Sequence, residues 1–152
     1  MRTRRMDLSN PAPAKLDPLD ALLGYHLRRT QVAVFQHFTR SMAELDITPG
    51  QFGVLALIEA NAGLSQSRLG AALGIDRSSV VAVIDRLEGR GLVIRAAAPS
   101  DRRSHALRLS TRGTATLRRL KGLVETHERD IARDLSPSER AQLISLLRRV
   151  AR

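Results

Sequence analysis

The 152-residue chain has the length of one domain with its own hydrophobic core, and it contains no cysteine. The lack of thiols excludes disulfides, iron–sulfur clusters, thiolate zinc sites and cysteine-based redox sensing. The net charge of +10 comes mainly from arginine, which favours a polyanionic partner, although a GC-rich genome would produce the same bias. Four aromatic residues are too few for a base-stacking surface that binds single-stranded nucleic acid.

The N-terminal segment carries no targeting signal that the sequence makes visible. No apolar run of about 18 residues could cross a membrane, and no apolar signal core follows the basic residues Met1–Arg5. We therefore expect a cytoplasmic protein without a membrane partner. Residues 1–16 include Pro11 and Pro13 and show little periodicity, which predicts a flexible basic N-terminal arm.

Helical periodicity begins at Asp17 and predicts one long helix that ends near Asp46. Its apolar stripe consists of Leu19, Leu22, Leu23, Leu27, Thr30, Val34, Phe38, Met42 and Leu45. Capping residues then predict three shorter helices. Thr48 with Pro49 and Gln51 begins a helix that ends at residues 61–63, Ser65 begins one over 66–73, and Asp76 begins one over 77–90.

After Gly91 the pattern changes to a β-hairpin. Residues 92–96 read as a strand, 99–103 as a turn with a charged tip, and 105–109 as a return strand with period two. Ser110 caps another long helix, whose apolar side includes Ile131 and Leu135. Ser136, Pro137 and Glu139 form a capping box that opens a final helix. The fold class is thus mainly α (α+β).

Residues 66–87 fit a helix-turn-helix. Leu69 and Leu73 face inwards, Gly70 is small where the two helices approach, and Gly74 permits the turn. The core side of the second helix is predicted to carry Ile75, Val80, Val83, Ile84 and Leu87. Its opposite face carries Arg77, Ser78, Ser79, Val81, Ala82 and Asp85.

Two interpretations of that opposite face are open. Small and hydroxylated side chains suit close contact with base edges, and an arginine in the first turn suits a phosphate. The alternative is a packed helical pair with a solvated face. The hairpin that follows favours DNA, because a strand–turn–strand after such a helix makes a winged helix, predicted here over 47–109 with its wing over 92–109. The tip arginines Arg102 and Arg103 suit the negative potential of a narrow minor groove.

Two segments of the chain resemble a known signature. Leu87–Arg95 and Asp101–Gly113 together resemble the multiple antibiotic resistance regulator (MarR) family of winged helix-turn-helix transcriptional regulators, and Ile47–Leu55 is similar to the family's second helix. The resemblance covers roughly residues 19–150.

The resemblance implies a homodimer that binds double-stranded DNA. A helix over 17–46 and the helices over 110–152 would form a helical dimerisation domain, and two winged helices would meet successive major grooves of a pseudo-palindromic operator. By the same similarity, Arg77, Ser78 and Ser79 would contact the major groove, and Gln66 and Ser67 would contact phosphates.

In the wing, the resemblance places Arg103 in the minor groove, with Asp101 holding its guanidinium and Arg102 on the DNA backbone. Arg86 and Arg95 are further candidates for DNA contacts, and one or both instead brace the wing.

The family usually responds to small molecules, so the resemblance also implies an effector: an aromatic acid, a phenol or an acyl-CoA thioester. Candidate lining residues are Tyr25, His26, Arg28, Arg29, Phe35 and Phe52. The two arginines would hold a carboxylate or phosphate. The alternative is that the apolar members belong to the core, the polar ones lie at the surface, and the arginines make dimer salt bridges.

The sequence favours neither an enzyme nor a metal site. It has no nucleophile elbow, phosphate-cradling loop or zinc-protease pair, and its four histidines show no close ligand spacing. We expect no cofactor and no metal, and the resemblance implies a repressor. Two other functions stay open: a nonspecific architectural DNA-binding protein, and a winged-helix module that binds protein.

Overall fold

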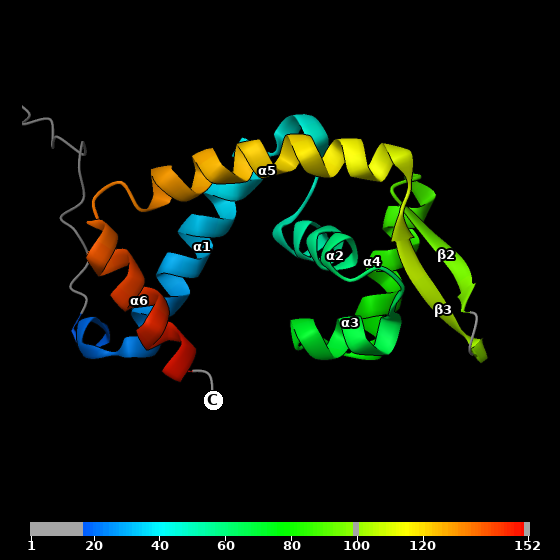
Figure 1. The fold of residues 1–152 in the computed structure, drawn as a ribbon. Coiled ribbons are helices and arrows are strands. Elements are labelled where there is room, and N and C mark those ends of the chain that lie inside the picture. Colours follow the sequence, from blue (N-terminus) through cyan, green and yellow to red (C-terminus); the bar gives the residue numbers. More distant parts are fainter. Residues whose placement is uncertain (1–16, 99–100, 151–152) are drawn as a thin grey trace, which may run out of the picture. The chain divides into compact units, whose positions relative to one another are not determined.

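The computed structural model describes residues 17–98 and 101–150, without the side chains of 97, 98 and 101–105 (Figure 1). The predicted N-terminal arm lies outside the described residues. The chain divides into two compact units, Met1–Ala33 and Val34–Arg152. The chain is mostly helical with a small antiparallel sheet, which confirms the predicted fold class. In the described part, no helix is both long enough and apolar enough to span a membrane.

The predicted helix over 17–46 is interrupted at both ends. A 3₁₀ helix, η1 (Leu19–Ala21), precedes α1 (Leu23–Ser41), and a second, η2 (Ala43–Leu45), follows it. Leu22 has extended backbone, and Asp46 has the left-handed φ of 46°. The prediction of one continuous helix was therefore wrong, because the apolar stripe continues through turns that are not α-helical and brings Met42 into the core.

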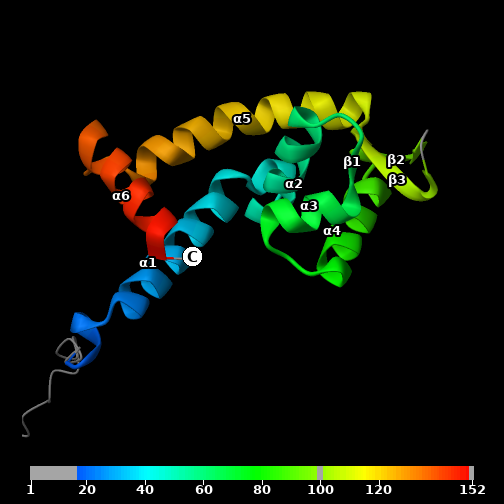
Figure 2. The same ribbon diagram turned by 60° about the horizontal axis from the view of Figure 1, so that its bottom comes forward.

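The three central helices begin where their capping residues indicate. They are α2 (Pro49–Ala60), α3 (Gln66–Leu73) and α4 (Arg77–Gly89). In the capping box of α2, the Gln51 amide N–H donates to Thr48 Oγ1 at 3.3 Å, and the Thr48 N–H donates to Gln51 Oε1 at 3.0 Å. Gly74 ends α3 in the left-handed conformation that glycine favours, with φ of 64°. Figure 2 shows α3 and α4 side by side.

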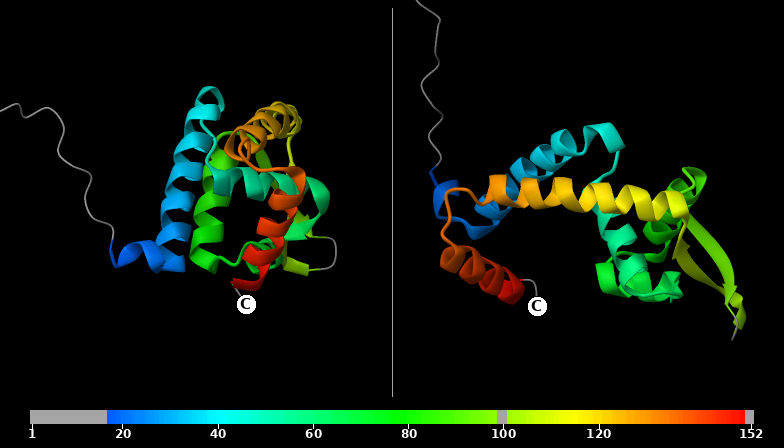
Figure 3. Two further views of the ribbon diagram at one scale, coloured as in Figure 1. Left: turned by 90° about the vertical axis from the view of Figure 1, so that its left-hand side faces the viewer. Right: turned by 45° about the horizontal axis from the view of Figure 1, so that its top comes forward.

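Three antiparallel strands follow the order β1–β3–β2, with β1 (Leu64–Ser65), β2 (Val93–Ala98) and β3 (Asp101–Leu109). The sequence did not predict β1, because two residues are too few to show alternation. Part of the predicted turn over 99–103 belongs to a strand instead, because β3 already begins at Asp101, and the pairing with β2 shifts register between Ala97 and Ala98. The hairpin of β2 and β3 extends from the beginning of α5 (Figure 3).

Two helices complete the chain, α5 (Thr111–Ile131) and α6 (Pro137–Val150). Helix α5 ends before Leu135, which the prediction had placed on its apolar side. At its start, a Cβ on Gly113 would lie 1.9 Å from the carbonyl oxygen of Leu92, so only glycine fits against the residue that precedes β2. Ser136 and Glu139 make the predicted capping box of α6.

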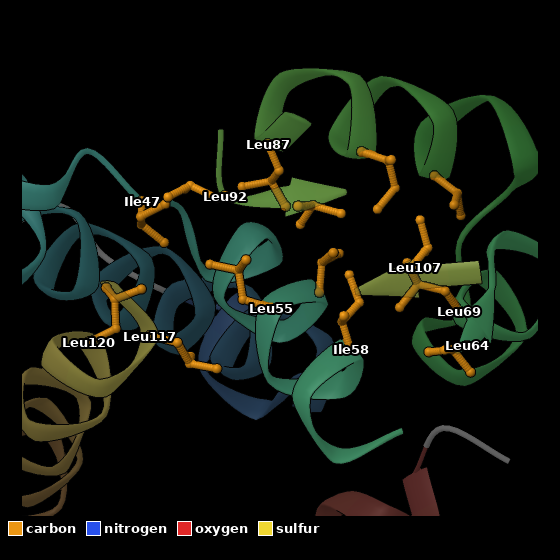
Figure 4. Close-up of a cluster of buried hydrophobic side chains, with 14 of the residues drawn as sticks. Ile47, Leu55, Ile58, Leu64, Leu69, Leu87, Leu92, Leu107, Leu117 and Leu120 are labelled. Carbon is orange, nitrogen blue, oxygen red and sulfur yellow. The ribbon is translucent and has the colours of Figure 1, made fainter. Parts of the chain in front are cut away.

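One hydrophobic core joins α2, α3, α4, α5 and the sheet (Figure 4). Among its fully buried side chains are Leu55, Leu69, Ile84, Leu87, Leu107 and Leu117. Ile75 was predicted to be a core residue, but it is 37% exposed, because it lies in the turn between α3 and α4. The core therefore fixes α4 through its inner face and leaves its outer face in solvent.

Candidate DNA-binding surface

Helices α3 and α4 pack as closely as a helix-turn-helix requires. A Cβ on Gly70 would lie 3.0 Å from Val80 Cγ2 and 3.1 Å from the carbonyl oxygen of Ile75. The predicted close approach at Gly70 is thus confirmed. It fixes the position of α4 relative to α3.

The first turn of α4 is organised by Asp76. Its carboxylate accepts hydrogen bonds from the hydroxyls of Ser78 and Ser79 and, at 3.0 Å, from the Ser79 N–H. These bonds, those from the serine hydroxyls above all, hold the pKa of Asp76 well below its usual range. Asp76 was predicted to be a cap, and its hold on both serine hydroxyls is an additional role that the sequence did not indicate.

The outer face of α4 forms a shallow groove. It has a volume of about 490 Å³ and is lined by Arg77, Ser78, Val81, Ala82 and Asp85. These residues all belong to the face that the sequence analysis singled out. The short side chains bring the helix backbone near any partner, while Arg77 places a cation at the helix N-terminus, where the backbone dipole already favours an anion.

Arg95 links the wing to α4. From β2, its guanidinium pairs with the carboxylates of both Asp85 and Glu88, and its backbone N–H donates to Glu88 Oε1 at 3.4 Å. A guanidinium shared by two carboxylates has few donors left for phosphate. By contrast, the exposed Arg86 makes no hydrogen bond or ion pair through its side chain with any described residue.

Arg90 anchors the other end of α4. Its guanidinium donates to the carbonyl oxygens of Leu45, at 2.8 Å, and Asp46, at 2.5 Å. This role of Arg90 was not predictable from the sequence, because the acceptors are backbone atoms about 45 residues away and leave no motif. The bonds hold α4 to the turn before α2.

The remaining predicted DNA contacts lie at the start of α3 and in the wing. Gln66 and Ser67 occupy the first turn of α3, half-buried and exposed respectively. The backbone of Asp101, Arg102 and Arg103 lies in β3, but their side chains are outside the described part. The predicted pairing of Asp101 with Arg103 therefore stays a prediction.

The candidate effector residues fall into both units. In Met1–Ala33, the Arg29 guanidinium lies 5.6 Å from the Tyr25 ring centroid and donates to its hydroxyl at 3.4 Å. His26 lies 2.7 Å from the Asp20 carbonyl oxygen, and Arg28 donates to Gln31 at 3.0 Å.

The other two candidates, Phe35 and Phe52, lie in Val34–Arg152. Phe35 is 45% exposed, whereas Phe52 packs on the core with its ring centroid 6.2 Å from that of Phe38.

A histidine pair that the sequence did not reveal joins α1 to α5. The Nδ1 atoms of His37 and His127 lie 2.7 Å apart, although 90 residues separate them in the chain. His127 is only 3% exposed. Burial, followed by the nearby His37, lowers the pKa of His127 below the ordinary histidine value.

Comparisons with known proteins agree with this architecture. The model of the MarR family matches residues 45–104. A putative transcriptional regulatory protein for the hcr operon of Thauera aromatica is 43% identical over 131 residues, which cover 86% of this chain and 79% of the relative.

Two solved structures of the transcriptional repressor CouR are also similar. The one bound to a 23-mer DNA duplex is 46% identical with a TM-score of 0.88, covering 91% of this chain and 99% of that one. The one bound to p-coumaroyl-CoA is 43% identical with a TM-score of 0.84, covering 91% and 97%. The helix-turn-helix, the wing and the similarity to these relatives lead to one conclusion. The chain belongs to the MarR family of DNA-binding transcriptional regulators, which are not enzymes.

Proposed function

We propose that this regulator is a repressor that binds a pseudo-palindromic operator as a homodimer and leaves it when an aromatic acyl-CoA thioester binds. The observation that carries the proposal is the similarity, at 46% and 43% identity, to one repressor solved both with duplex DNA and with p-coumaroyl-CoA. An aromatic acid or a phenol without CoA is the alternative effector class.

The outer face of α4 is suited to reading the major groove. Arg77 would contact a phosphate or base at the helix N-terminus, and Ser78 and Ser79 would turn their hydroxyls from Asp76 to the DNA. Gln66 and Ser67 would contact the backbone from α3, and Arg103 would enter the minor groove from the wing. Arg86 is exposed, has no partner among the described side chains and would contact a phosphate, whereas we assign Arg95 to bracing the wing.

The homodimer is supported by apolar side chains that each unit leaves in solvent. Helix α6 has no buried residue at all. Its exposed apolar residues are Leu143, Ile144, Leu146, Leu147 and Val150, and the first unit adds Leu19, Leu22 and Leu23. Burying such stripes is the main source of stability for amphipathic helices, so a second copy of the chain is their proposed partner.

The effector proposal draws on the charge of the first unit. Arg28 and Arg29 are adjacent and exposed, and a CoA thioester carries phosphates that guanidinium groups bind well. Tyr25, packed under Arg29, offers an aromatic surface nearby.

The test is a gel shift of DNA from upstream of the protein's own gene. The protein–DNA complex is measured after adding p-coumaroyl-CoA, free p-coumarate or CoA, each in a separate reaction. We expect p-coumaroyl-CoA to release the DNA, whereas free p-coumarate and CoA alone do not. Release by p-coumarate alone would assign the aromatic acid as effector. No release by any of them would reject the proposed effector class while leaving DNA binding intact.

Competition with random duplex distinguishes the two remaining functions. A specific regulator resists displacement from the operator by random DNA. An architectural protein is displaced equally well by random DNA and by unlabelled operator. A protein-binding module would give no footprint at any salt concentration.

A further inference from the structure

The His37–His127 contact holds at most one proton between its two facing nitrogens. At 2.7 Å, one Nδ1 must donate a hydrogen and the other must accept it. The pair is satisfied when both imidazoles are neutral or when one is protonated. If both rings are cationic, two N–H groups face each other and the hydrogen bond is lost.

The groups around the pair distinguish its two members. On α1, the Ser41 hydroxyl lies 3.3 Å from His37 Nδ1, and the edge-on Phe38 ring covers His127 with 5.2 Å between centroids. On α5, the Asp130 carboxylate lies 3.9 Å from His37 Nε2.

Two carboxylates favour the charged form of His127, but their effect is smaller than that of burial and of His37. Glu128 pairs with Arg140 of α6 at 2.7 Å, and Asp130 lies beside His37. From α2, the apolar ring of Phe52 packs near Phe38. Burial and the neighbouring His37 therefore make His127 the member of the pair that resists a proton.

The pair is better suited to a proton than to a metal ion. Within the described residues, no three His, Asp or Glu side chains gather as metal ligands. A closed protein zinc site takes three or four ligands, and the 3% exposure of His127 leaves little room for water to complete the set.

Helix α5 connects this pair to the wing. Its first turn is fixed to the strand region by the Ser110 hydroxyl, which donates to the Gly91 carbonyl at 2.6 Å, and by the contact of Gly113 with Leu92. One continuous helix runs from there to His127. Helix α5 is thus the element that connects the His127 contact with the base of the wing.

We infer that His37 and His127 form an acid-sensitive latch between α1 and α5, whose opening by a second proton weakens operator binding. The part that concerns DNA rests on the proposed function. The sign follows from the burial of His127: the closed state resists a proton that the open state accepts. The closed state is therefore fully favoured above about pH 6.5, the ordinary histidine value, and loses its advantage as the pH falls below it.

The latch itself is tested on the full-length protein without DNA. In ¹⁵N-labelled protein at pH 7.5, we expect a scalar coupling between the two Nδ1 nuclei across the hydrogen bond, and its disappearance during acidification. The pKa of His127 should lie below the ordinary histidine value. Absence of the coupling at pH 7.5, or titration of His127 at the ordinary histidine value, would overturn the inference without reference to DNA binding.

The functional link is tested with His37→Asn. The Asn amide group can donate to neutral His127 or, when flipped, accept from its protonated form, so the contact survives both states. Between pH 7.5 and 5.5 we expect the operator Kd of the wild type to rise about tenfold more than that of the variant, within the limit of about tenfold per pH unit set by one proton. Gln36→Asn, an exposed change in the same helix, should keep the wild-type pH dependence.

Each failure has a different meaning. Equal acid sensitivity in His37→Asn and wild type would overturn the link between the latch and DNA. Failure of the wild type to bind the operator at pH 7.5 would instead contradict the proposed function, and the coupling experiment would then decide the latch by itself.

Discussion

Gly113 allows the first turn of α5 to pack closely against the backbone at the base of the wing. Because a Cβ there would overlap the Leu92 backbone carbonyl at 1.9 Å, Gly113→Ala must displace either α5 or the backbone just before β2. We expect a loss of more than about 4 kcal/mol in the free energy of unfolding, measured by urea denaturation. The matched control is Gly122→Ala in the same helix, where a Cβ meets nothing within 4 Å and should stabilise by up to about 1 kcal/mol. Similar effects of the two changes would contradict this packing.

A second residue-scale prediction concerns the wing tip. Arg103→Ala should weaken operator binding and reduce the slope of log K against log salt by about 1, because one cation no longer displaces counterions from the DNA. Arg118→Ala, which removes an exposed charge from α5, should leave the slope unchanged. An unaltered slope and affinity in Arg103→Ala would remove the wing tip from the DNA contact.

At the scale of elements, the wing and α4 act as one body through Arg95. Its two carboxylate partners are partly exposed, so Arg95→Ala should cost only about 1 kcal/mol of stability. We expect it to weaken operator binding about tenfold, through loss of alignment, with no change in the salt slope. Arg86→Ala should instead lower the slope by about 1, as loss of a phosphate contact does. A lower slope for Arg95→Ala would make it a DNA contact.

Local signals made most elements predictable. Thr48, Ser65, Asp76 and Ser110 each cap the helix that the sequence assigned to them, because a cap acts within one helical turn. The apolar stripe of the first helix misled the prediction, since 3₁₀ turns at both ends keep a similar spacing while breaking the α-helix.

The long-range parts of the site could not be predicted in the same way. The bonds of Arg90 to Leu45 and Asp46 and the contact of His37 with His127 depend on tertiary packing across 44 to 90 residues. Sequence spacing carries no information about such pairs. The outer face of α4 was predictable because helical periodicity alone separates it from the core side.

At the scale of the whole molecule, the described chain leaves two kinds of surface without a partner. One is the polar outer face of α4, with its cation and hydroxyls; the other is the apolar face of α6 and of the first unit. The winged helix has its own core of buried side chains, so it does not need the exposed apolar faces in order to fold. Their retention is explained if operator binding requires two copies held at a fixed spacing.

The last prediction tests that requirement. Leu147→Arg places a charge in the middle of the apolar face of α6, where Leu147 is 41% exposed in the single chain. Because the winged helix does not depend on this side chain, we expect the variant to stay folded but to sediment as a monomer and to lose operator affinity. Ser145→Arg adds the same charge about 160° around the same helix and should still form the dimer. If Leu147→Arg remains a dimer of normal mass, α6 is not in the interface, and the apolar residues of the first unit would have to pair the two copies on their own.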